Sequence, residues 1–343
     1  MNQPASLPPS FQLSRMVASL WIPQVLHAVA NLGVADAVGA DGRASDAVAR
    51  AIGADPAAVH RLLRAMVALE LCTEAEDGRF ALTPLGACLR ADAPDSVRSW
   101  VMLMGGEMVW RCWGRLAECV RTGEPAPMLL EGKDAFEWIA AHPTEFAIFD
   151  HSMQELTRRA APAITAAYDF AGVGSVVDVG GGHGALLCRI LQRHPHLRGV
   201  VFDQPHCASG AVALFAEGGV ADRFRFTAGS FFEAVPADAD VYLLKSVVHD
   251  WNDARSIDIL RVCRAALRAD ARLVLVEVVV PARPGSSPLD QMIAGTDLNM
   301  LVMTGGRERT EAQYRALCAA VGLQVTRILP TATAFSLIEA AAA

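Results

Sequence analysis

The sequence predicts an α/β protein: a mostly parallel sheet covered by helices, preceded by a mainly helical N-terminal region. Two observations lead to this prediction. From residue 175 onward, near-continuous apolar runs alternate with helical stretches, as in parallel sheets that are covered on both faces. Before that point the apolar residues recur at helical spacing, with no convincing run of buried strands. The length of 343 residues fits two domains of roughly 100–200 residues each.

Composition and charge narrow the class of protein. Hydrophobic residues make up 52% of the chain and charged residues 20%, which excludes extensive disorder. The net charge of −7 argues against a nucleic-acid partner. No apolar run approaches the ~18 residues that a membrane span needs, and no secretory pattern begins the chain. The eight cysteines have no metal-ligand spacing, so we expect a cytoplasmic enzyme with reduced thiols, no metal and no membrane partner.

Residues 45–86 predict two helices followed by a hairpin. Gly53 marks the turn between the helices, and Asp55 is a candidate N-cap for the second one. Asp77 and Gly78 favour a tight hairpin turn. This is the outline of a winged helix, which serves either DNA recognition or dimerisation.

The charge of the N-terminal region separates these two interpretations. Residues 1–100 contain eight Arg and no Lys against ten acidic residues. DNA binding depends on phosphate contacts and therefore on local cations. The sequence thus favours a dimerisation domain over a DNA-binding regulator.

The second half of the chain contains seven candidate strands. The last two lie close together in the sequence, so we expect them to pair antiparallel at one edge of the sheet. The apolar runs are residues 175–181, 198–204, 223–230, 240–247, 272–280, 324–333 and 334–341. We predict three parts: a winged-helix-like domain at 11–100, linker and pocket helices at 101–170, and a cofactor-binding catalytic domain at 171–343.

A glycine cluster, DVGGGHG at 178–184, lies between the first of these strands and a predicted helix. Glycines such as Gly180 and Gly182 allow a tight turn and a close approach of the backbone to a ligand. Asp203 ends the next strand, at the distance where an acidic residue bonds a ribose diol. A strand-to-helix turn that binds no ligand would not need the acidic side chain of Asp203. The loop itself fits either S-adenosylmethionine or NAD, because both carry such a ribose.

Three further positions carry candidate reacting groups. His249 and Asp250 follow an apolar strand, at the edge where open α/β sheets bind ligands, and imidazole suits a general base near neutral pH. Glu277 interrupts a strand that should be buried, so its carboxylate needs a partner such as His249, unless it lies at the solvated strand end. Glu308 follows a Gly-Gly turn near a predicted helix start and would make sense as a second acid beside His249.

Taken together, five motifs resemble a known family. They occur in the order DVGGGHG, FDQP, LLKSVVHDW, the Glu of VEVVVP, and GGRERT. In this order they are similar to the S-adenosylmethionine-dependent O-methyltransferases of the caffeate/hydroxyindole class, whose bacterial members act in aromatic secondary metabolism. The resemblance covers about residues 11–340. It implies a Rossmann-like methyltransferase sheet, a winged-helix-like dimerisation domain, S-adenosylmethionine as cofactor, an aromatic small-molecule substrate and a homodimer.

The resemblance also implies roles for individual residues. His249 would be the general base, flanked by Glu277 and Glu308. The residues implied to contact the cofactor are Gly180, Gly182, Asp203, Ser230, Phe231, Lys245 and Trp251. Those implied to line the substrate pocket are Met153, Asp250, Asn299, Met300 and Met303.

Two residues depart from the family pattern. Ser230 stands where the family usually has an Asp that meets the adenine amino group, so that hydrogen bond would be weaker. Asn299 is polar where plant members often carry an aliphatic residue, which indicates a polar group on the substrate.

The family chemistry needs a base more than a metal, because the sulfonium methyl is already activated. A phenol with a pKa near ~10 is mostly protonated at neutral pH, so His249 would remove its proton during transfer. Four alternatives stay open at this point: an aromatic nitrogen as acceptor, a relative that binds the cofactor without methylating, an NAD-dependent oxidoreductase and a winged-helix regulator.

Overall fold

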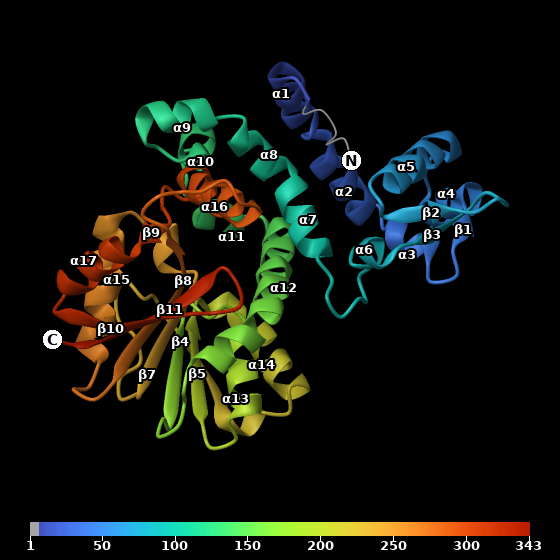
Figure 1. Cartoon of the computed structure of the whole chain (residues 1–343). Helices are drawn as coiled ribbons and strands as arrows, with labels where there is room; N and C mark the ends of the chain where they lie inside the picture. Colours follow the sequence, from blue (N-terminus) through green and yellow to red (C-terminus); the bar gives the residue numbers. More distant parts are fainter. Residues whose placement is uncertain (1–6) are drawn as a thin grey trace, which may run out of the picture. The chain divides into compact units, whose positions relative to one another are not determined.

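The structure is a computed structural model that describes residues 7–343, and the chain forms two compact units (Figure 1). The first unit runs to Arg111 and takes up the chain again at Pro143–Glu155. The second comprises Cys112–His142 and Leu156–Ala343. The three-part division predicted from the sequence stays a prediction.

The first unit is mainly helical and has one small antiparallel sheet, in the order β1-β3-β2. Asp55 caps a helix as predicted, because its Oδ1 accepts the N–H of Ala58 at 2.8 Å. Gly53 ends the preceding helix with φ +66°, a left-handed value that favours glycine. The elements up to Arg111 are α1 (Pro9–Ala18), α2 (Trp21–Asn31), α3 (Val34–Val38), β1 (Arg43–Ala44), α4 (Ser45–Ile52), α5 (Pro56–Ala68), β2 (Cys72–Glu74), β3 (Arg79–Leu82), α6 (Pro84–Ala87), α7 (Arg98–Gly105) and most of α8 (Glu107–Trp113).

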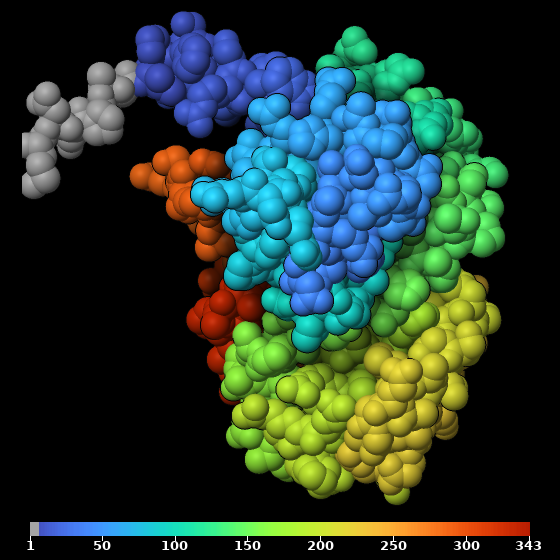
Figure 2. Space-filling view, turned by 90° about the vertical axis from the view of Figure 1, so that its right-hand side faces the viewer, coloured from blue at the N-terminus to red at the C-terminus, as the bar shows by residue number. Residues whose placement is uncertain are grey.

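Helix α1 contributes no buried residue to its unit. Figure 2 shows it in dark blue, projecting from the blue and cyan atoms of α3–β3. The exposed large hydrophobic side chains of α1 and the following residues are Phe11, Leu13, Met16, Val17, Leu20, Trp21 and Ile22. A run of apolar side chains this long on a surface marks an interaction site.

The second unit is built on a sheet with the order β10-β11-β8-β7-β4-β5-β6, and β9 pairs with β8. The strands β4 to β8 pair in parallel, as the apolar runs predicted. The strands are β4 (Ser175–Val179), β5 (Arg198–Asp203), β6 (Phe224–Ala228), β7 (Val241–Lys245), β8 (Arg272–Val280), β9 (Arg309–Thr310), β10 (Leu323–Pro330) and β11 (Phe335–Ala342).

The last two long strands form the predicted antiparallel pair, with β10 at the edge. Strand β11 lies between β10 and β8 and runs antiparallel to both. The C-terminal hairpin therefore extends the parallel sheet by β11, which runs against the other strands, and by β10, which runs in the same direction as β8.

Helices cover both faces of this sheet, as Figure 1 shows. One hydrophobic core packs α15 (Asp253–Ala266) and α17 (Glu311–Ala319) on one face, through residues such as Leu260 and Tyr314. The other core packs α13 (Ala185–Arg193), α14 (Ala208–Glu217) and the end of α12 (Pro143–Ala167) on the opposite face. The remaining helices are α9 (Leu116–Thr122), α10 (Ala126–Glu131), α11 (Ala135–Ala140) and α16 (Pro288–Met303), with short 3₁₀ turns at Pro205–Cys207 (η1), Ala221–Arg223 (η2) and Val248–Asp250 (η3).

Across residues 7–343, we find no helix with both the length and the apolarity that crossing a membrane requires.

Candidate active site

The predicted base lies in a 3₁₀ turn at the carboxyl end of β7. His249 is the middle residue of η3, which begins three residues after the strand. Glu277 lies on the neighbouring strand β8, and Glu308 immediately precedes β9, which pairs with β8. Because β7, β8 and β9 run in parallel, their ends bring the three side chains to one edge of the sheet. Ligands in open α/β sheets bind at this edge.

The imidazole of His249 meets a carboxylate on each side. Its Nδ1 lies 3.0 Å from Oε1 of Glu308 and 3.7 Å from Oε2 of Glu277. Its Nε2 lies 3.7 Å from Oδ1 of Asp250. The structure thus brings together the four residues that the motifs singled out for the chemistry. Since Nδ1 is engaged by Glu308, Nε2 is the nitrogen left to exchange a proton with a substrate.

Glu277 is fully buried, so the interpretation that it lies at a solvated strand end is wrong. Its Oε1 accepts the backbone N–H groups of Val247 at 3.1 Å and Val248 at 2.9 Å. Within residues 7–343, the second oxygen of Glu277 and Oε2 of Glu308 have no hydrogen-bond partner. Buried carboxylate oxygens without donors are costly, which indicates that they serve the positively charged form of the ring beside them.

The surroundings change the pKa of His249, Glu277 and Asp250. Burial lowers the pKa of His249, but Glu277, Asp250 and Glu308 outweigh it and raise the pKa to about 10. Burial raises the pKa of Glu277 to about 7 and that of Asp250 to about 6, although the imidazolium opposes both shifts. Lys245, behind the cluster, has a pKa lowered by burial despite the nearby acids. Perturbed groups gathered in one place are typical of active sites.

The ring and the two glutamates could also serve as metal ligands, since one donor atom from each lies within 4.8 Å of the others. In the part of the chain that the structure describes, this is the group of His, Cys, Asp or Glu side chains whose donor atoms lie close enough together to hold a metal ion. The hydrogen bond between Nδ1 and Glu308 already uses the nitrogen that a metal would need.

The glycine loop follows β4 and takes left-handed backbone conformations. The φ angles are +69° at Gly180, +59° at Gly182 and +78° at Gly184. A Cβ on Gly180 would lie 2.8 Å from Cγ2 of Val247, two residues before the base. The loop is therefore in contact with the turn that carries His249.

Asp203 ends β5 beside the same loop. Its Oδ2 accepts the N–H of Gly182 at 2.6 Å, and its Oδ1 accepts the N–H of Gln204 at 2.6 Å. The carboxylate is thereby held at the carboxyl edge of the sheet, where it retains further lone pairs for a hydroxyl pair.

Aromatic rings gather around Trp251, the second residue after His249. Phe231 and Phe232 approach it edge-on, with ring centroids 6.3 Å and 4.8 Å away. Phe136 of α11 stacks on the same indole at 5.6 Å. Phe136 was missed in the sequence, where nothing links it to a residue more than one hundred positions later.

Ser230 and Lys245 have partners within the chain. The Oγ of Ser230 accepts the N–H of Phe232 at 3.2 Å, so its hydroxyl proton is available to an outside acceptor. The ammonium of Lys245 donates to Oγ of Ser246 at 3.3 Å and lies 5.0 Å from the centroid of the Phe335 ring.

The predicted substrate-pocket residues divide between the two units. Asn299 and Met303 lie half-buried on α16, where Met300 is buried. The indole N–H of Trp113 donates to Oδ1 of Asn299 at 3.0 Å, which orients the amide so that its NH₂ group is the free donor. Met153 lies on α12 within the first unit.

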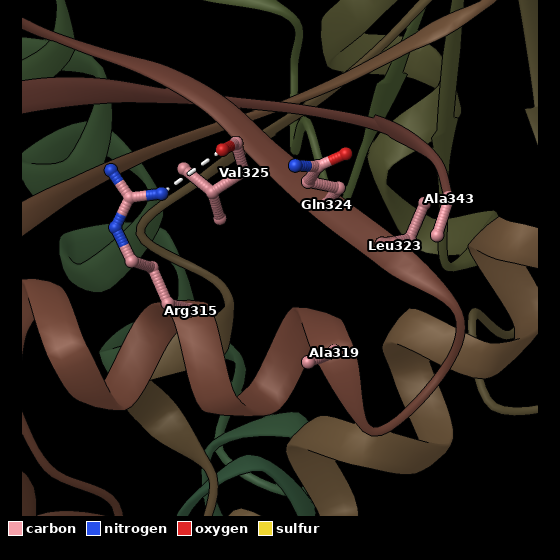
Figure 3. A pocket seen from close by; sticks show the side chains of 6 residues that line it. All are labelled: Arg315, Ala319, Leu323, Gln324, Val325 and Ala343. Atoms are coloured by element: carbon pink, nitrogen blue, oxygen red, sulfur yellow. Dashed lines mark hydrogen bonds between the residues drawn. The ribbon is translucent and has the colours of Figure 1, made fainter.

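Two shallow hollows of the second unit lie away from His249. One, of about 370 Å³, lies between α17 and β10; Figure 3 shows Arg315 on one side of it, bonded to the carbonyl of Val325. The other, of about 460 Å³, lies beside β6 and includes Gly229 and Ser230. Only the second touches a residue predicted to contact the cofactor.

Comparisons with known proteins identify the chain. Residues 113–324 match the family model of the O-methyltransferase domain, and residues 14–92 match that of the O-methyltransferase dimerisation domain. The chain belongs to the O-methyltransferase family. This confirms the resemblance drawn from the five motifs.

Individual relatives of this O-methyltransferase are similar over most of their length. The phenazine O-methyltransferase PhzM of Lysobacter antibioticus is 40% identical over 339 residues, 99% of this chain and 98% of that protein. The O-demethylpuromycin-O-methyltransferase of Streptomyces alboniger is 44% identical, over 93% of this chain and 85% of its own. An 8-amino-8-demethylriboflavin N,N-dimethyltransferase of Streptomyces davaonensis is 32% identical, over 92% and 90%.

Solved structures agree with the fold. The crystal structure of LaPhzM has a TM-score of 0.93 at 40% identity, covering 98% of this chain and all of its own. The O-methyltransferase NcsB1, solved with S-adenosylmethionine and 2-hydroxy-5-methyl naphthoic acid, has a TM-score of 0.82 at 34% identity, covering 99% of this chain and all of its own. The Rossmann-like fold predicted for the catalytic part is confirmed.

Proposed function

We propose that this O-methyltransferase transfers the methyl group of S-adenosylmethionine to a hydroxyl of an aromatic small molecule, with His249 as the general base. The observation that carries the proposal is the contact between the glycine loop and the base-bearing turn. Gly180 approaches Val247 so closely that a Cβ would not fit between them. A cofactor held by the loop would therefore present its reactive end near His249.

The residues of the loop region suit this cofactor. Gly180 allows the tight turn of the loop, and open space at Gly182 lets a ligand approach the backbone. Asp203 offers carboxylate lone pairs for a ribose, and Phe231 and Trp251 offer apolar faces for a purine. Ser230 and Lys245 would complete the set. When bound, the cofactor supplies an activated methyl group, so the chain needs no covalent intermediate.

His249 is the residue that moves a proton in this proposal. In the free enzyme its raised pKa keeps the ring protonated near neutral pH. A cofactor with a positive charge would, when bound near the ring, favour loss of the ring proton to solvent, which would leave Nε2 able to act as a base. Nε2 then accepts the proton of the substrate hydroxyl, while Glu308 and Glu277 stabilise the imidazolium that forms.

The substrate class follows from the side chains that we expect to contact the substrate. Met300 and Met303 offer adaptable apolar contacts, and Asp250 and the amide of Asn299 offer polar ones. The relatives named for phenazine and puromycin compounds support a fused or substituted aromatic ring as the acceptor.

A second candidate is methyl transfer to an aromatic nitrogen. The relative named as an N,N-dimethyltransferase supports it, since it matches 92% of this chain. The same base would serve either acceptor.

We also propose that the first unit forms a homodimer through α1 and its neighbours. The match to a dimerisation domain and the exposed apolar residues of α1 and α2 support this. The helices and hairpin of residues 45–86 would then be a winged-helix outline used for assembly. Trp21→Glu should convert the dimer to a monomer in light scattering; an unchanged mass would contradict the role of this surface.

The first test is thermal stabilisation by S-adenosylhomocysteine and by NAD, followed by methyl transfer to a panel of phenols and aromatic amines. At ~100 times its dissociation constant, a ligand should stabilise the protein by about 2.7 kcal/mol, a shift of several degrees. We expect a shift with S-adenosylhomocysteine alone and turnover of phenols. Stabilisation by NAD alone would overturn the proposal, and turnover of amines alone would establish the second candidate.

A further inference from the structure

Arg309 is the largest fully buried side chain of the described residues, and it lies directly beneath the base-bearing turn. Its Nη1 donates to the carbonyl of Val248 at 2.9 Å, and its Nη2 donates to the carbonyl of Trp251 at 2.7 Å. Val248 and Trp251 are the residues on either side of the His249–Asp250 pair. One planar guanidinium therefore spans the turn that presents the base.

The remaining donors of Arg309 are also satisfied. Its Nε and Nη2 donate to Oδ1 of Asp253 at 3.1 Å and 2.9 Å, and Nη2 also donates to Oγ of Ser256 at 3.1 Å. Burying a guanidinium is costly unless its charge and its donors are all matched. These partners match the planar guanidinium group, which presents several donors in a fixed geometry. A lysine ammonium cannot reproduce that geometry.

The residues just before Arg309, in the segment that leads into β9, hold the same turn. Gly306 packs so closely that a Cβ there would lie 2.0 Å from the carbonyl oxygen of His249. The N–H of Arg307 donates to that carbonyl at 2.8 Å, and Glu308 accepts from the ring. Residues 306–309 thus hold the backbone of the turn and its imidazole together.

We propose that Arg309 is a positioning residue for the reaction: by binding the carbonyls of Val248 and Trp251, it keeps the imidazole of His249 at hydrogen-bond distance from Glu308. The inference rests on the proposed role of His249 as the base. The reason for a large effect is geometric, since a misplacement of ~1 Å at a reacting group can cost 10²-fold in rate.

Ser256 also supports the turn, so we expect that Arg309 can be replaced without unfolding the chain. The Oγ of Ser256 lies 3.2 Å from the carbonyl oxygens of both Val248 and Trp251. Without the guanidinium, the carbonyl of Val248 still accepts the N–H of Trp251 at 3.3 Å, and the single hydroxyl proton of Ser256 can serve either carbonyl. The turn can therefore shift without losing all of its hydrogen bonds.

The experiment compares Arg309→Met and Arg309→Lys with the control Arg315→Met. Arg315 lies on the adjacent helix α17, where it donates to Glu311 and to the carbonyl of Val325. Figure 3 shows the bond to Val325, in a hollow whose lining residues do not include His249. Three measurements are made on the full-length enzyme. They are the steady-state kinetics of methyl transfer, which give kcat and KM, the affinity for S-adenosylhomocysteine, and the pH titration of the His249 ring by NMR.

We expect Arg309→Met to lower kcat by about 10- to 100-fold, with KM and cofactor affinity changed by less than about threefold. The NMR titration of His249 should move to lower pH, because the ring loses its fixed contact with Glu308. Arg309→Lys should recover part of kcat, and Arg315→Met should match the wild type in all three measurements.

A purely structural role would give a different pattern. If Arg309→Met lowers the melting temperature but leaves kcat and the His249 titration unchanged, the proposal is wrong.

If Arg309→Met does not fold, Asp253→Asn replaces it. This variant removes the negative charge beside Arg309 and should also move the His249 titration to lower pH. An unmoved titration overturns the proposal. The NMR readout needs no turnover, so inactivity of the wild type toward every acceptor would refute the proposed function alone.

Discussion

The glycine loop and the base cluster lie in contact, but they are built from different parts of the chain. The loop depends on backbone conformation, with three glycines at positive φ between β4 and α13. The cluster depends on side chains, which β7, β8 and the segment before β9 bring together as buried charges. The loop should therefore control cofactor affinity, whereas the cluster should control rate. The predictions below test that division.

The largest effect should come from removing the base. We expect His249→Ala to lower kcat by about 10²–10⁴-fold, the usual contribution of general base catalysis, while the affinity for S-adenosylhomocysteine changes by less than about threefold. Initial rates and calorimetric titration measure the two quantities. Turnover close to that of the wild type would exclude His249 as the base.

Changing the loop should produce the opposite pattern. Gly180→Ala adds a Cβ at φ +69° that meets Val247, and such strain costs about 1–3 kcal/mol. We expect cofactor affinity to fall by about tenfold or more, with a smaller loss of kcat at saturation.

Gly53→Ala is the matched control, because Gly53 has a similar φ of +66° and open space around it, far from the loop in the sequence. It should cost stability without changing cofactor affinity. Equal loss of affinity in both variants would contradict the role of the Gly180 position.

A smaller effect should follow from Glu308→Gln, which replaces the carboxylate bonded to Nδ1. Because Glu308 is one of the acids that raise the pKa of His249, we expect that pKa to fall. The rising limb of the profile of kcat/KM against pH should then move to lower pH, with about a tenfold lower plateau. Glu311→Gln, which removes an exposed carboxylate, should leave the profile in place, and an unmoved limb in Glu308→Gln would refute the coupling.

The smallest effect concerns the free energy of unfolding. A histidine whose pKa is raised by folding contributes stability that is complete below its unfolded pKa of ~6.5 and is lost as pH rises through about 10. Between pH 8 and pH 10, the wild type should lose more stability than His249→Asn, by a difference of the order of 1 kcal/mol. Urea unfolding at both pH values measures it; parallel losses would show that His249 does not carry the raised pKa.

Much of the sheet could be predicted because buried parallel strands have continuous apolar sequences. The glycine loop could be predicted because its backbone conformation favours glycine. His249 and Glu277 were predictable for a related reason: each is a polar residue at or within an apolar run. Their meeting followed from the parallel order of β7 and β8.

Other parts of the site depend on packing that leaves no local signal. Arg309 is one of two arginines in the GGRERT segment, and burial alone distinguishes it from Arg307. The stacking of Phe136 on Trp251 and the bond between Trp113 and Asn299 join residues more than one hundred positions apart. No spacing rule reaches over such distances in one sequence.

In the proposed homodimer, helix α1 depends on a second copy of the chain for its stability. It has ten residues and buries none of them within its unit, and isolated helices shorter than ~12–15 residues are marginal in water. If a second copy covers it, the amide hydrogens of α1 should exchange slowly in concentrated solution and rapidly on dilution, while those of the central sheet stay protected. The exchange rate of the α1 amides would then report whether the chain is a monomer or a dimer.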